Sequence, residues 1–366
     1  MKLNNSFKLL TFIFILIPLL CDAQVARKYS NAFLDIGVGA RGLALSGAQT
    51  ASVSDVTAGY WNPAGLTQIE DKFQASLMHA EYFGDIANYD YGAYAQKVGE
   101  KGTLGLTLIR FGVDGILNTT QLIDNQGNVN YDRIETFSAA DYAFIGSYAQ
   151  KLGVEGLSVG GSAKIIYRQI GDFANSYGFG LDAGVQYRKK NFLMGATLQD
   201  VTSTFNAWNF SIDEETKTSF EQTGNDLPES ELEIKLPQLR VGFGYYAKVY
   251  KKLDLLAETD AIVSTDGQRN VLISAKPFSI DPVLGLEFSY SQIVFFRASL
   301  GNITRSESFE IDKLGEDEIQ MQPNIGVGIK LGNLTIDYTL TDIGDQSETV
   351  VSNIFSLKYA LPSSSY

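Results

Sequence analysis

The feature that most constrains this chain is a segment of roughly ten residues, repeated many times, in which apolar and polar side chains alternate. Residues 177–188 carry Tyr177, Phe179, Leu181, Ala183, Val185 and Tyr187 at one parity and Gly178, Gly180, Asp182, Gly184, Gln186 and Arg188 at the other. Successive side chains of a β-strand point to opposite faces, so such a strand meets hydrocarbon on one side and polar groups on the other. Repeated strands of this kind are typical of transmembrane β-barrels, and we therefore expect an outer-membrane protein.

The chain starts with the pattern of a signal peptide. Lys2 and Lys8 give a positive start, and the apolar run Leu9–Leu20 is too short to span a bilayer. We expect residues 1–23 to be removed by cleavage before Gln24. The alternative is a lipoprotein modified at Cys21, although the bulky leucine before it does not suit that processing. Cleavage before Gln24 would remove the single cysteine and with it any disulfide or thiol chemistry.

Fourteen segments follow the alternating pattern, and we predict an all-β, fourteen-stranded antiparallel transmembrane barrel over residues 71–361, with a short tail at 362–366. The predicted strands are Lys72–Tyr82, Asn88–Val98, Thr103–Phe111, Ala140–Lys151, Gly156–Gln169, Ser176–Arg188, Asn191–Asp200, Gln238–Val249, Leu253–Val263, Pro282–Tyr290, Ile293–Gly301, Met321–Leu331, Leu334–Thr341 and Val351–Ala360. Tight turns alternate with longer connections, as in outer-membrane barrels with short periplasmic turns and long external loops. The longest predicted loops are Gly112–Ala139, Val201–Pro237, Ser264–Asp281 and Asn302–Gln320.

Negative charge is concentrated in two of the external loops. The formal net charge is −13, and Ser211–Glu233 holds eight acidic residues against Lys217 alone, while Glu307–Glu318 holds six against Lys313. A nucleic-acid partner is excluded, because phosphate needs a basic surface. Solvated loops are the simplest interpretation, and Ca²⁺ or a basic partner surface are the alternatives.

The segment 24–70 precedes the first strand and does not follow the barrel pattern. It is rich in glycine and alanine and ends in a turn formed by Trp61, Asn62, Pro63, Ala64 and Gly65. A segment of this size can fold back as a plug inside the barrel, where Arg41 or Asp55 could meet charged wall residues. By parity the inward charged residues include Lys164, Arg168, Asp182, Arg240, Asp254, Glu258, Asp260, Glu287, Arg297, Asp337 and Lys358. We expect these charges to pair with each other or with the plug; a lined conduit is the alternative.

These residues carry a family resemblance. The runs FLDIGVGARGLALSGAQTA (Phe33–Ala51) and YWNPAGL (Tyr60–Leu66) resemble the N-terminal signature of the PorV/PorQ family of Bacteroidota outer-membrane proteins, which is related to FadL-type fatty-acid channels. Leu236–Gly242 and the C-terminal run ending in Phe355–Tyr359 resemble further landmarks of that family. The resemblance implies a FadL-like barrel with an N-terminal plug and a role in type 9 secretion, binding the translocon or collecting secreted substrates. Leu45-Ser46-Gly47 departs from the family pattern, which leaves open a divergent member with a different client.

Aromatic residues stand among the acids of the external loops. Val201–Pro237 holds Phe205, Trp208, Phe210 and Phe220, and the second acidic loop holds Glu307 and Phe309. Exposed aromatics beside acids suit a protein-docking surface. The alternative is a lid that folds inward, as a channel for hydrophobic solutes would require.

Enzymatic chemistry has little support in the sequence. Gly37–Gly42 matches G-x-G-x-x-G but lacks the flanking strand and helix that dinucleotide binding needs, so we interpret it as plug packing. His79, the single histidine, falls on the lipid-facing parity of its strand, which disfavours a catalytic base and excludes histidine-based metal sites. The spacing of Asp254, Glu258 and Asp260 is the period of a barrel strand, so a polar lumen explains them. We therefore predict no catalytic residue, cofactor or metal site.

Two functional hypotheses remain after this exclusion. The first is a non-enzymatic barrel that binds other outer-membrane or secreted proteins, as an accessory of type 9 secretion or of a related outer-membrane complex, with membrane lipid and lipopolysaccharide around it. The second is passive uptake of hydrophobic solutes through a FadL-like conduit, which predicts an apolar pocket near the outer mouth and a lateral opening or a kink in the plug.

Overall fold

The structure is a computed structural model that describes residues 30–122, 128–223, 226–227, 232–307, 317–341 and 351–363. The predicted signal peptide, Phe309 and Tyr366 lie outside the described residues. Within them, no helix combines the length and the hydrophobicity needed to cross a membrane.

The described strands form one antiparallel sheet that closes on itself as a fourteen-stranded barrel, which confirms the predicted fold class. Closure comes from β1, which pairs with β2 on one side and with β17 on the other, where Phe73 faces Leu361. The barrel strands are β1 Phe73–Tyr82, β2 Ala87–Val98, β3 Gly102–Asn118, β4 Glu135–Lys151, β5 Leu157–Ile170, β6 Ala174–Lys189, β7 Phe192–Gln199, β10 Gln238–Tyr250, β11 Leu253–Ser264, β13 Ser279–Tyr290, β14 Val294–Glu307, β15 Asp317–Leu331, β16 Leu334–Thr341 and β17 Ser352–Leu361.

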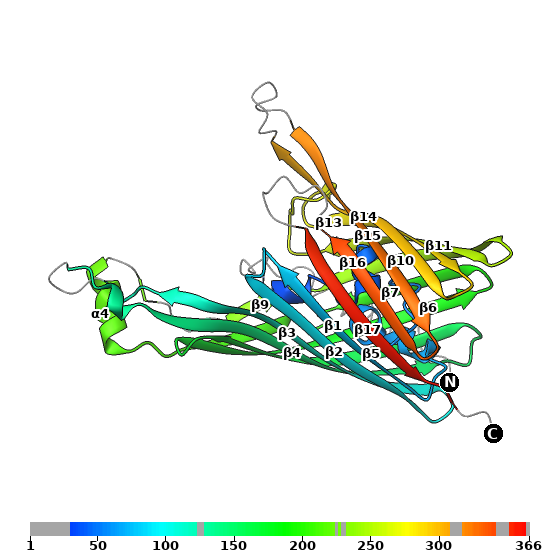
Figure 1. Ribbon diagram of the computed structural model, residues 1–366, viewed down its shortest axis with the longest axis horizontal. Coiled ribbons are helices and arrows are strands. Elements are labelled where there is room, and N and C mark those ends of the chain that lie inside the picture. Colours follow the sequence, from blue (N-terminus) through cyan, green and yellow to red (C-terminus); the bar gives the residue numbers. More distant parts are fainter. Residues whose placement is uncertain are drawn as a thin grey trace, which may run out of the picture.

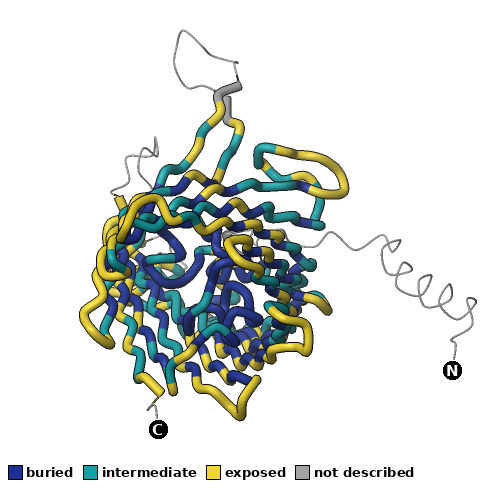
Figure 2. Tube along the Cα trace, turned by 90° about the vertical axis from the view of Figure 1, so that its right-hand side faces the viewer, coloured by how far each residue is buried: buried dark blue, intermediate teal, exposed yellow. Residues whose placement is uncertain are grey.

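The two faces of the wall differ as the alternation predicts. Leu77, Leu106 and Tyr177 are more than 60% exposed on the outer face, whereas Ser76 and Ser176 are buried on the inner face. Figure 2 looks along the barrel and shows buried and exposed positions alternating around the ring. Apolar side chains covering the outside of a closed barrel require a hydrocarbon environment, so the protein is a multi-pass β-barrel of the outer membrane.

The long connections contain more regular structure than predicted. The interpretation of Val201–Pro237 as one loop is wrong, since it holds β8 Thr204–Phe210, α4 Glu214–Thr223 and β9 Leu232–Lys235. The strand β8 pairs with residues 174–179 of β6, beyond the part of β6 that pairs with β7. The residues of β8 favour a strand, and their pairing satisfies backbone groups of β6 that would otherwise lack partners.

The other long connections are corrected in the same way. The predicted loop Gly112–Ala139 is shorter, because β3 and β4 continue to pair up to Asn118 and Glu135. The predicted loop Ser264–Asp281 contains β12 Ile273–Ser274, and η4 Tyr131–Arg133 lies between β3 and β4. In Figure 1 the strands near α4 project as an arm from the left end of the barrel, and β14 and β15 project at the top.

The N-terminal segment lies inside the barrel. Its short helices are η2 Ala32–Leu34, α2 Ala40–Ala44, α3 Ala58–Trp61 and η3 Pro63–Gln68. Nearly all of its residues from Val38 to Ile69 are buried, and Figure 2 shows this buried segment within the ring of strands. We call residues 30–69 the plug.

The topology predicts which rim faces the cell exterior. If cysteines are introduced at Tyr131, between β3 and β4, and at Asn333, in the β15–β16 turn, a membrane-impermeant maleimide added to intact cells should label only the first. The reason is that the long connections all lie on one rim, whereas the rim where the barrel begins and ends has only short turns. Breaking the outer membrane should make both positions reactive, which serves as the control. Labelling of Asn333→Cys alone in intact cells would reverse the assigned orientation.

Candidate functional site

The plug is built around the indole of Trp61. Cβ atoms added at Gly37, Gly42 and Gly47 would each come within 3.0 Å of that ring, so only glycine lets the backbone approach so closely. The indole Nε1 donates to the carbonyl of Val38 at 3.0 Å, and Tyr60 packs edge-on against the ring at 4.9 Å. Two glycines of the G-x-G-x-x-G run are therefore used in packing, as the sequence analysis interpreted them.

The Asn-Pro-Ala turn attaches the plug to the barrel wall. The Asn62 side chain accepts from the amide of Ala64 at 3.2 Å and donates to the carbonyl of Val185 in β6 at 3.1 Å. Pro63 packs against Gly160 and Gly184, where any Cβ would collide with the turn. Glycines in two wall strands thus make room for the motif, and its asparagine satisfies backbone groups on both sides.

A chain of buried ion pairs joins the plug to the opposite wall. Arg41 meets Glu287 of β13 with two hydrogen bonds, at 2.8 and 3.2 Å, and Arg297 of β14 meets the same carboxylate at 2.6 Å. Arg297 continues to Asp337 of β16 at 2.7 Å. Because buried charges are costly unless they are paired, this four-residue network favours one position of the plug.

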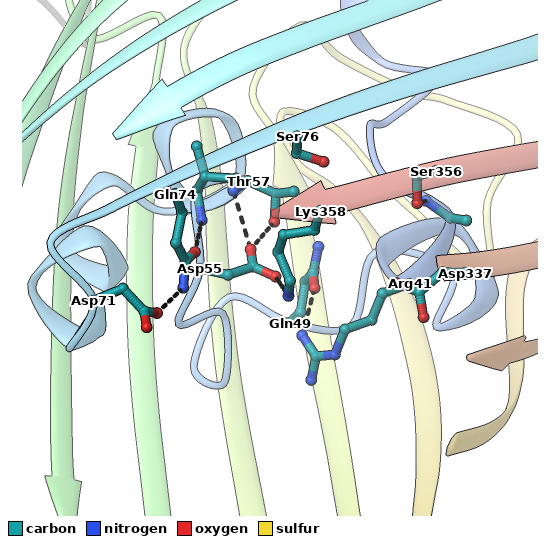
Figure 3. Close-up of polar contacts among 12 residues, drawn as sticks. Arg41, Gln49, Asp55, Thr57, Asp71, Gln74, Ser76, Asp337, Ser356 and Lys358 are labelled. Carbon is teal, nitrogen blue, oxygen red and sulfur yellow. Dashed lines mark hydrogen bonds and ion pairs between the residues drawn. The ribbon is translucent and has the colours of Figure 1, made fainter. Parts of the chain in front are cut away.

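A second ion pair lies nearer the end of the chain. Asp55 in the plug contacts Lys358 of β17 at 2.5 Å and accepts hydrogen bonds from Thr57 (Figure 3). Burial by itself would raise the pKa of the Asp55 carboxyl, but Lys358 and then Arg41 outweigh it and hold that pKa well below its usual range. Asp55 therefore stays ionised and bound.

Two acids of β11 hold the plug in a way that the sequence analysis missed. Glu258 accepts from the backbone amide of Ala51 at 2.7 Å, and Asp260 accepts from that of Thr50 at 3.0 Å. The sequence analysis expected such inward charges to pair with each other or with the plug, but it did not identify backbone amides as the partners of these two. Their period-two spacing showed the face on which they lie, but their partners are backbone groups, which leave no trace in side-chain patterns.

The plug divides the lumen into two chambers. The outer chamber, of about 340 Å³, is lined by Leu43 and Trp61 of the plug and by Arg240, Asp281 and Asn324 of the wall. The periplasmic chamber, of about 370 Å³, is strongly polar; its lining includes the Arg41 and Asp55 ion pairs and lies beside the short turn at Gly332. Neither chamber is a purely apolar pocket.

The wall is kinked where β7 ends and β8 begins. Asp200 and Ser203 adopt left-handed backbone conformations, with φ of 55° and 60°, and between them Val201 donates its amide to the carbonyl of Leu181 at 2.8 Å. On the inner side, Lys164 binds Asp182 at 2.9 Å and Asp200 at 2.5 Å. The kink is thus closed by one backbone hydrogen bond and a buried ion-pair cluster.

A membrane-facing groove of about 920 Å³ runs along the outer wall beside this kink. Small residues, including Gly146, Gly161 and Ala163, form its floor, and Leu106 and Tyr148 are among the exposed side chains around it. Leu181 and Val201 also line it, so the groove reaches the kink. Its lining is predominantly apolar.

The structure separates the predicted loop aromatics. Trp208 and Phe210 lie on the inner face of β8, since they share parity with the buried Asn206, which binds the plug. The guanidinium of Arg168 lies 5.0 Å from the Trp208 ring centroid. Phe205 points outward and is exposed, and Phe220 lies on α4. Glu307 ends β14, and Phe309 lies outside the described residues.

The inner face of the outer mouth carries further aromatic residues. Phe137 of β4 and Phe173, in the turn before β6, pack edge to face at 5.2 Å, and Phe173 lies beside β8, where its carbonyl accepts from the amide of Ser211. Together with Trp208 and Phe210 they form what we call the mouth aromatics. The sequence showed these residue types but not which of them share a face.

His79 lies on the exposed outer face, where its Nδ1 is 2.7 Å from Asp90. This pair faces away from the lumen and both chambers. Among the described residues, no group of three or more potential ligands is arranged to hold a metal ion.

Proteins similar to this chain are found by comparing structures and not by comparing sequences. No protein-family model matches the sequence, and no curated protein matches it. Among solved structures, the CymD monoaromatic hydrocarbon channel is similar with a TM-score of 0.54 at 12% identity, covering 90% of this chain and 98% of that one.

Two further solved structures show the same likeness. The Ralstonia pickettii toluene transporter TbuX has a TM-score of 0.53 at 15% identity, covering 89% of this chain and 98% of its own. A Pseudomonas aeruginosa FadL homologue has a TM-score of 0.51 at 13% identity, covering 88% and 98%. The chain has the FadL-type barrel fold. At these identities the likeness concerns the fold, and the PorV/PorQ resemblance stays a prediction.

The ion-pair network predicts a large stability effect at one residue. Glu287→Gln leaves the guanidinium of Arg41 without its carboxylate and that of Arg297 with Asp337 alone, so we expect a loss of about 3 kcal/mol or more in the free energy of unfolding. Denaturant unfolding of the protein in lipid measures it. The matched control is Glu81→Gln, an exposed residue beside His79, whose effect should stay within about 0.5 kcal/mol. Equal effects of the two substitutions would mean that Glu287 does not hold the plug.

Proposed function

We propose that this protein is a non-enzymatic outer-membrane channel for small solutes with a hydrophobic body. The observation that carries the proposal is the wall kink at Asp200–Ser203, which has an apolar membrane-facing groove on its outer side. The periplasmic chamber, in contrast, is polar and crossed by ion pairs. A hydrophobic solute therefore has a more favourable path sideways through the wall than downward through the plug.

The arrangement suggests a sequence of steps. The mouth aromatics capture a solute by offering flat apolar surface at the exterior end. The solute then enters the outer chamber, where Arg240 hydrogen-bonds Gln199, the last residue before the kink. Opening the wall requires the Val201–Leu181 hydrogen bond and the contacts of Lys164 to give way. The plug stays in place throughout, held by its ion pairs.

The similar solved structures support this proposal by their described activities. CymD is described as a monoaromatic hydrocarbon channel, and TbuX as a toluene transporter. The toluene transporter TodX of Pseudomonas putida is also similar, with a TM-score of 0.51 at 10% identity. These descriptions favour a solute channel over a secretion accessory.

Cells that express the protein should take up a hydrophobic dye, such as N-phenylnaphthylamine, faster than cells that carry the empty vector. The double substitution Trp208→Ala with Phe210→Ala should slow uptake severalfold by removing the capture surface, and Ala163→Phe should slow it by filling the groove. Phe205→Ala, on the other face of β8, and Ala298→Phe, on the outer face far from the groove, are the matched controls. Uptake equal to that of vector cells, with the barrel correctly inserted, would reject the proposal.

A second candidate function is protein binding, which the projecting structure on the exterior rim favours. The β3–β4 hairpin, β8, α4 and β9 extend beyond the barrel as an arm (Figure 1). This arm carries exposed apolar residues such as Leu117, Tyr131 and Leu232 close to an acidic segment. A surface of this kind suits a partner with basic and aromatic residues, as a secretion accessory would need.

Affinity purification in mild detergent tests this second function. If the arm binds a partner, another outer-membrane or secreted protein should co-purify stoichiometrically, and Tyr131→Ala with Leu232→Ala should release it. A double substitution of exposed residues on the lipid-facing wall, Leu106→Ala with Leu77→Ala, is the control. Recovery of the barrel alone would count against protein binding while leaving the channel proposal intact.

A further inference from the structure

The rim that carries the short turns is basic, although the chain as a whole is acidic. The formal net charge is −13, yet this rim carries a set of exposed lysines: Lys72, Lys97, Lys101, Lys151, Lys189, Lys190, Lys248, Lys251, Lys252 and Lys330. None of them forms an ion pair with a described residue, and Lys97 donates instead to the carbonyl of Glu70 at 2.7 Å. These ammonium groups are therefore available to anions from outside the barrel.

Five of these lysines lie in or beside three neighbouring turns, those between β2 and β3, β4 and β5, and β6 and β7. They are Lys97, Lys101, Lys151, Lys189 and Lys190. Two of the turns are in direct contact, since the backbone amide of Lys151 donates to the carbonyl of Lys101 at 3.0 Å. Glu100 and Glu155 lie in the same turns, and neither forms an ion pair with a described residue. This sector of the rim therefore has a local excess of positive charge.

The membrane-facing groove begins beside these turns. Leu104 and Tyr148 line the groove and face each other across β3 and β4. Leu104 lies three residues after Lys101, and Tyr148 lies three residues before Lys151. That separation is about 10 Å along a strand, which a lysine side chain and a lipid head group can span together. At its other end the groove includes Val201, at the wall kink.

The groove itself is an open apolar depression between larger side chains. A Cβ added at Gly146 would meet no atom within 4 Å, and Gly146 stands between Leu106 and Ala163 in the strand register. Beyond the groove on the exterior side, Phe144 and Ile165 stand out from the wall and are more than half exposed. Because the groove faces hydrocarbon, only an apolar chain can fill its volume of about 920 Å³ favourably.

We propose that the groove and the lysines beside it form a binding site for an anionic phospholipid of the periplasmic leaflet. The lipid phosphate accepts hydrogen bonds from Lys101, Lys151 and Lys189. One acyl chain lies along the groove from Tyr148 towards Val201. Lysine clusters next to a membrane-spanning segment attract anionic lipid head groups, and here the cluster adjoins a groove that suits the chain of the same molecule.

The position of the two features favours a lipid over other anions. A free phosphate would pair with the lysines but leave the groove without an occupant. An acidic protein in the periplasm would also reach the lysines, but it would not enter the hydrocarbon beside Gly146 and Ala163, since its polar groups would lose their hydration there. A phospholipid supplies the negative charge at the rim and the apolar chain in the membrane.

The inference goes beyond the proposed function and does not require it. Its consequence for a channel is that the bound acyl chain covers the outer side of the kink at Leu181 and Val201, so a departing solute must displace it. Lipid binding is measured on the purified protein, whereas passage is measured on cells. Lipid binding without dye uptake would uphold the inference and reject the channel. Dye uptake without lipid binding would do the reverse.

Native mass spectrometry of the purified protein in detergent tests the site by counting the lipids that stay bound. Titrations compare dioleoylphosphatidylglycerol with dioleoylphosphatidylcholine, which has the same chains without net charge, and with glycerol 3-phosphate, which has no chains. The anionic lipid should saturate one site and bind roughly tenfold or more tightly than the zwitterionic one. Equal binding of the two lipids, or equal binding of glycerol 3-phosphate, would overturn the inference. Without saturable binding of the anionic lipid, an acidic protein would replace it as the expected partner.

Two variants separate the charged part of the site from the apolar part. The triple substitution Lys101→Gln, Lys151→Gln and Lys189→Gln should weaken the anionic lipid roughly tenfold or more and leave the zwitterionic one unchanged. Ala163→Phe should weaken both lipids severalfold by filling the groove. Because the first result is a ratio of two lipids on one variant, a partly unfolded sample does not mimic it.

Each variant has a matched control on the same barrel. The triple substitution Lys248→Gln, Lys251→Gln and Lys252→Gln removes as much charge from the same rim, at the β10–β11 turn away from the groove. Ala298→Phe adds the same ring to the outer face of β14. Neither control should change the affinity for the anionic lipid by more than about twofold. If the two lysine triples weaken it equally, the attraction belongs to the whole rim and the assigned site is rejected.

Discussion

The structure depends on closure of the backbone hydrogen-bond network within a hydrocarbon environment. A strand edge facing lipid would leave its amides and carbonyls without partners, and each unsatisfied group costs several kcal/mol there. Pairing of β1 with β17 removes the last free edge. Once the wall is closed, alternation along each strand sends apolar side chains to the lipid and polar ones to the lumen. The plug and both chambers follow from that division.

A closed lumen lined with charge needs compensation, and the plug supplies much of it. Arg41 neutralises Glu287, and Asp55 neutralises Lys358. Backbone amides of Thr50 and Ala51 each donate to one oxygen of an acid of β11. The apolar side of the plug packs against the inner faces of β1–β5, where residues such as Tyr89 and Ile109 are fully buried. The plug is therefore complementary to a wall that is apolar on one side and charged on the other. Arg188 and Arg240 are held differently, since Arg188 donates to the plug carbonyls of Ser52 and Val53 and Arg240 donates to Gln199.

Much of the fold could be predicted from the chain, because each barrel strand has its own pattern. The predicted strand Leu334–Thr341 agrees with β16 at both ends, and most other strands agree within two residues. The errors concern the exterior rim. The residues of β8 were assigned to a loop, because their pairing with residues 174–179 of β6 depends on where β7 ends. That is a property of two distant segments, which no local pattern contains.

The sequence by itself determined the barrel, its lipid-facing and lumen-facing residues, and the presence of a small-residue plug, because alternation and glycine content are local properties. Only the tertiary structure decided which charges meet. Parity placed Arg240 and Glu287 alike in the lumen, yet one remains without a carboxylate and the other binds two arginines. Strand tilt and the path of the plug set those distances, and they result from packing of the whole barrel. The chambers, the wall kink and the inward turn of Trp208 arise in the same way.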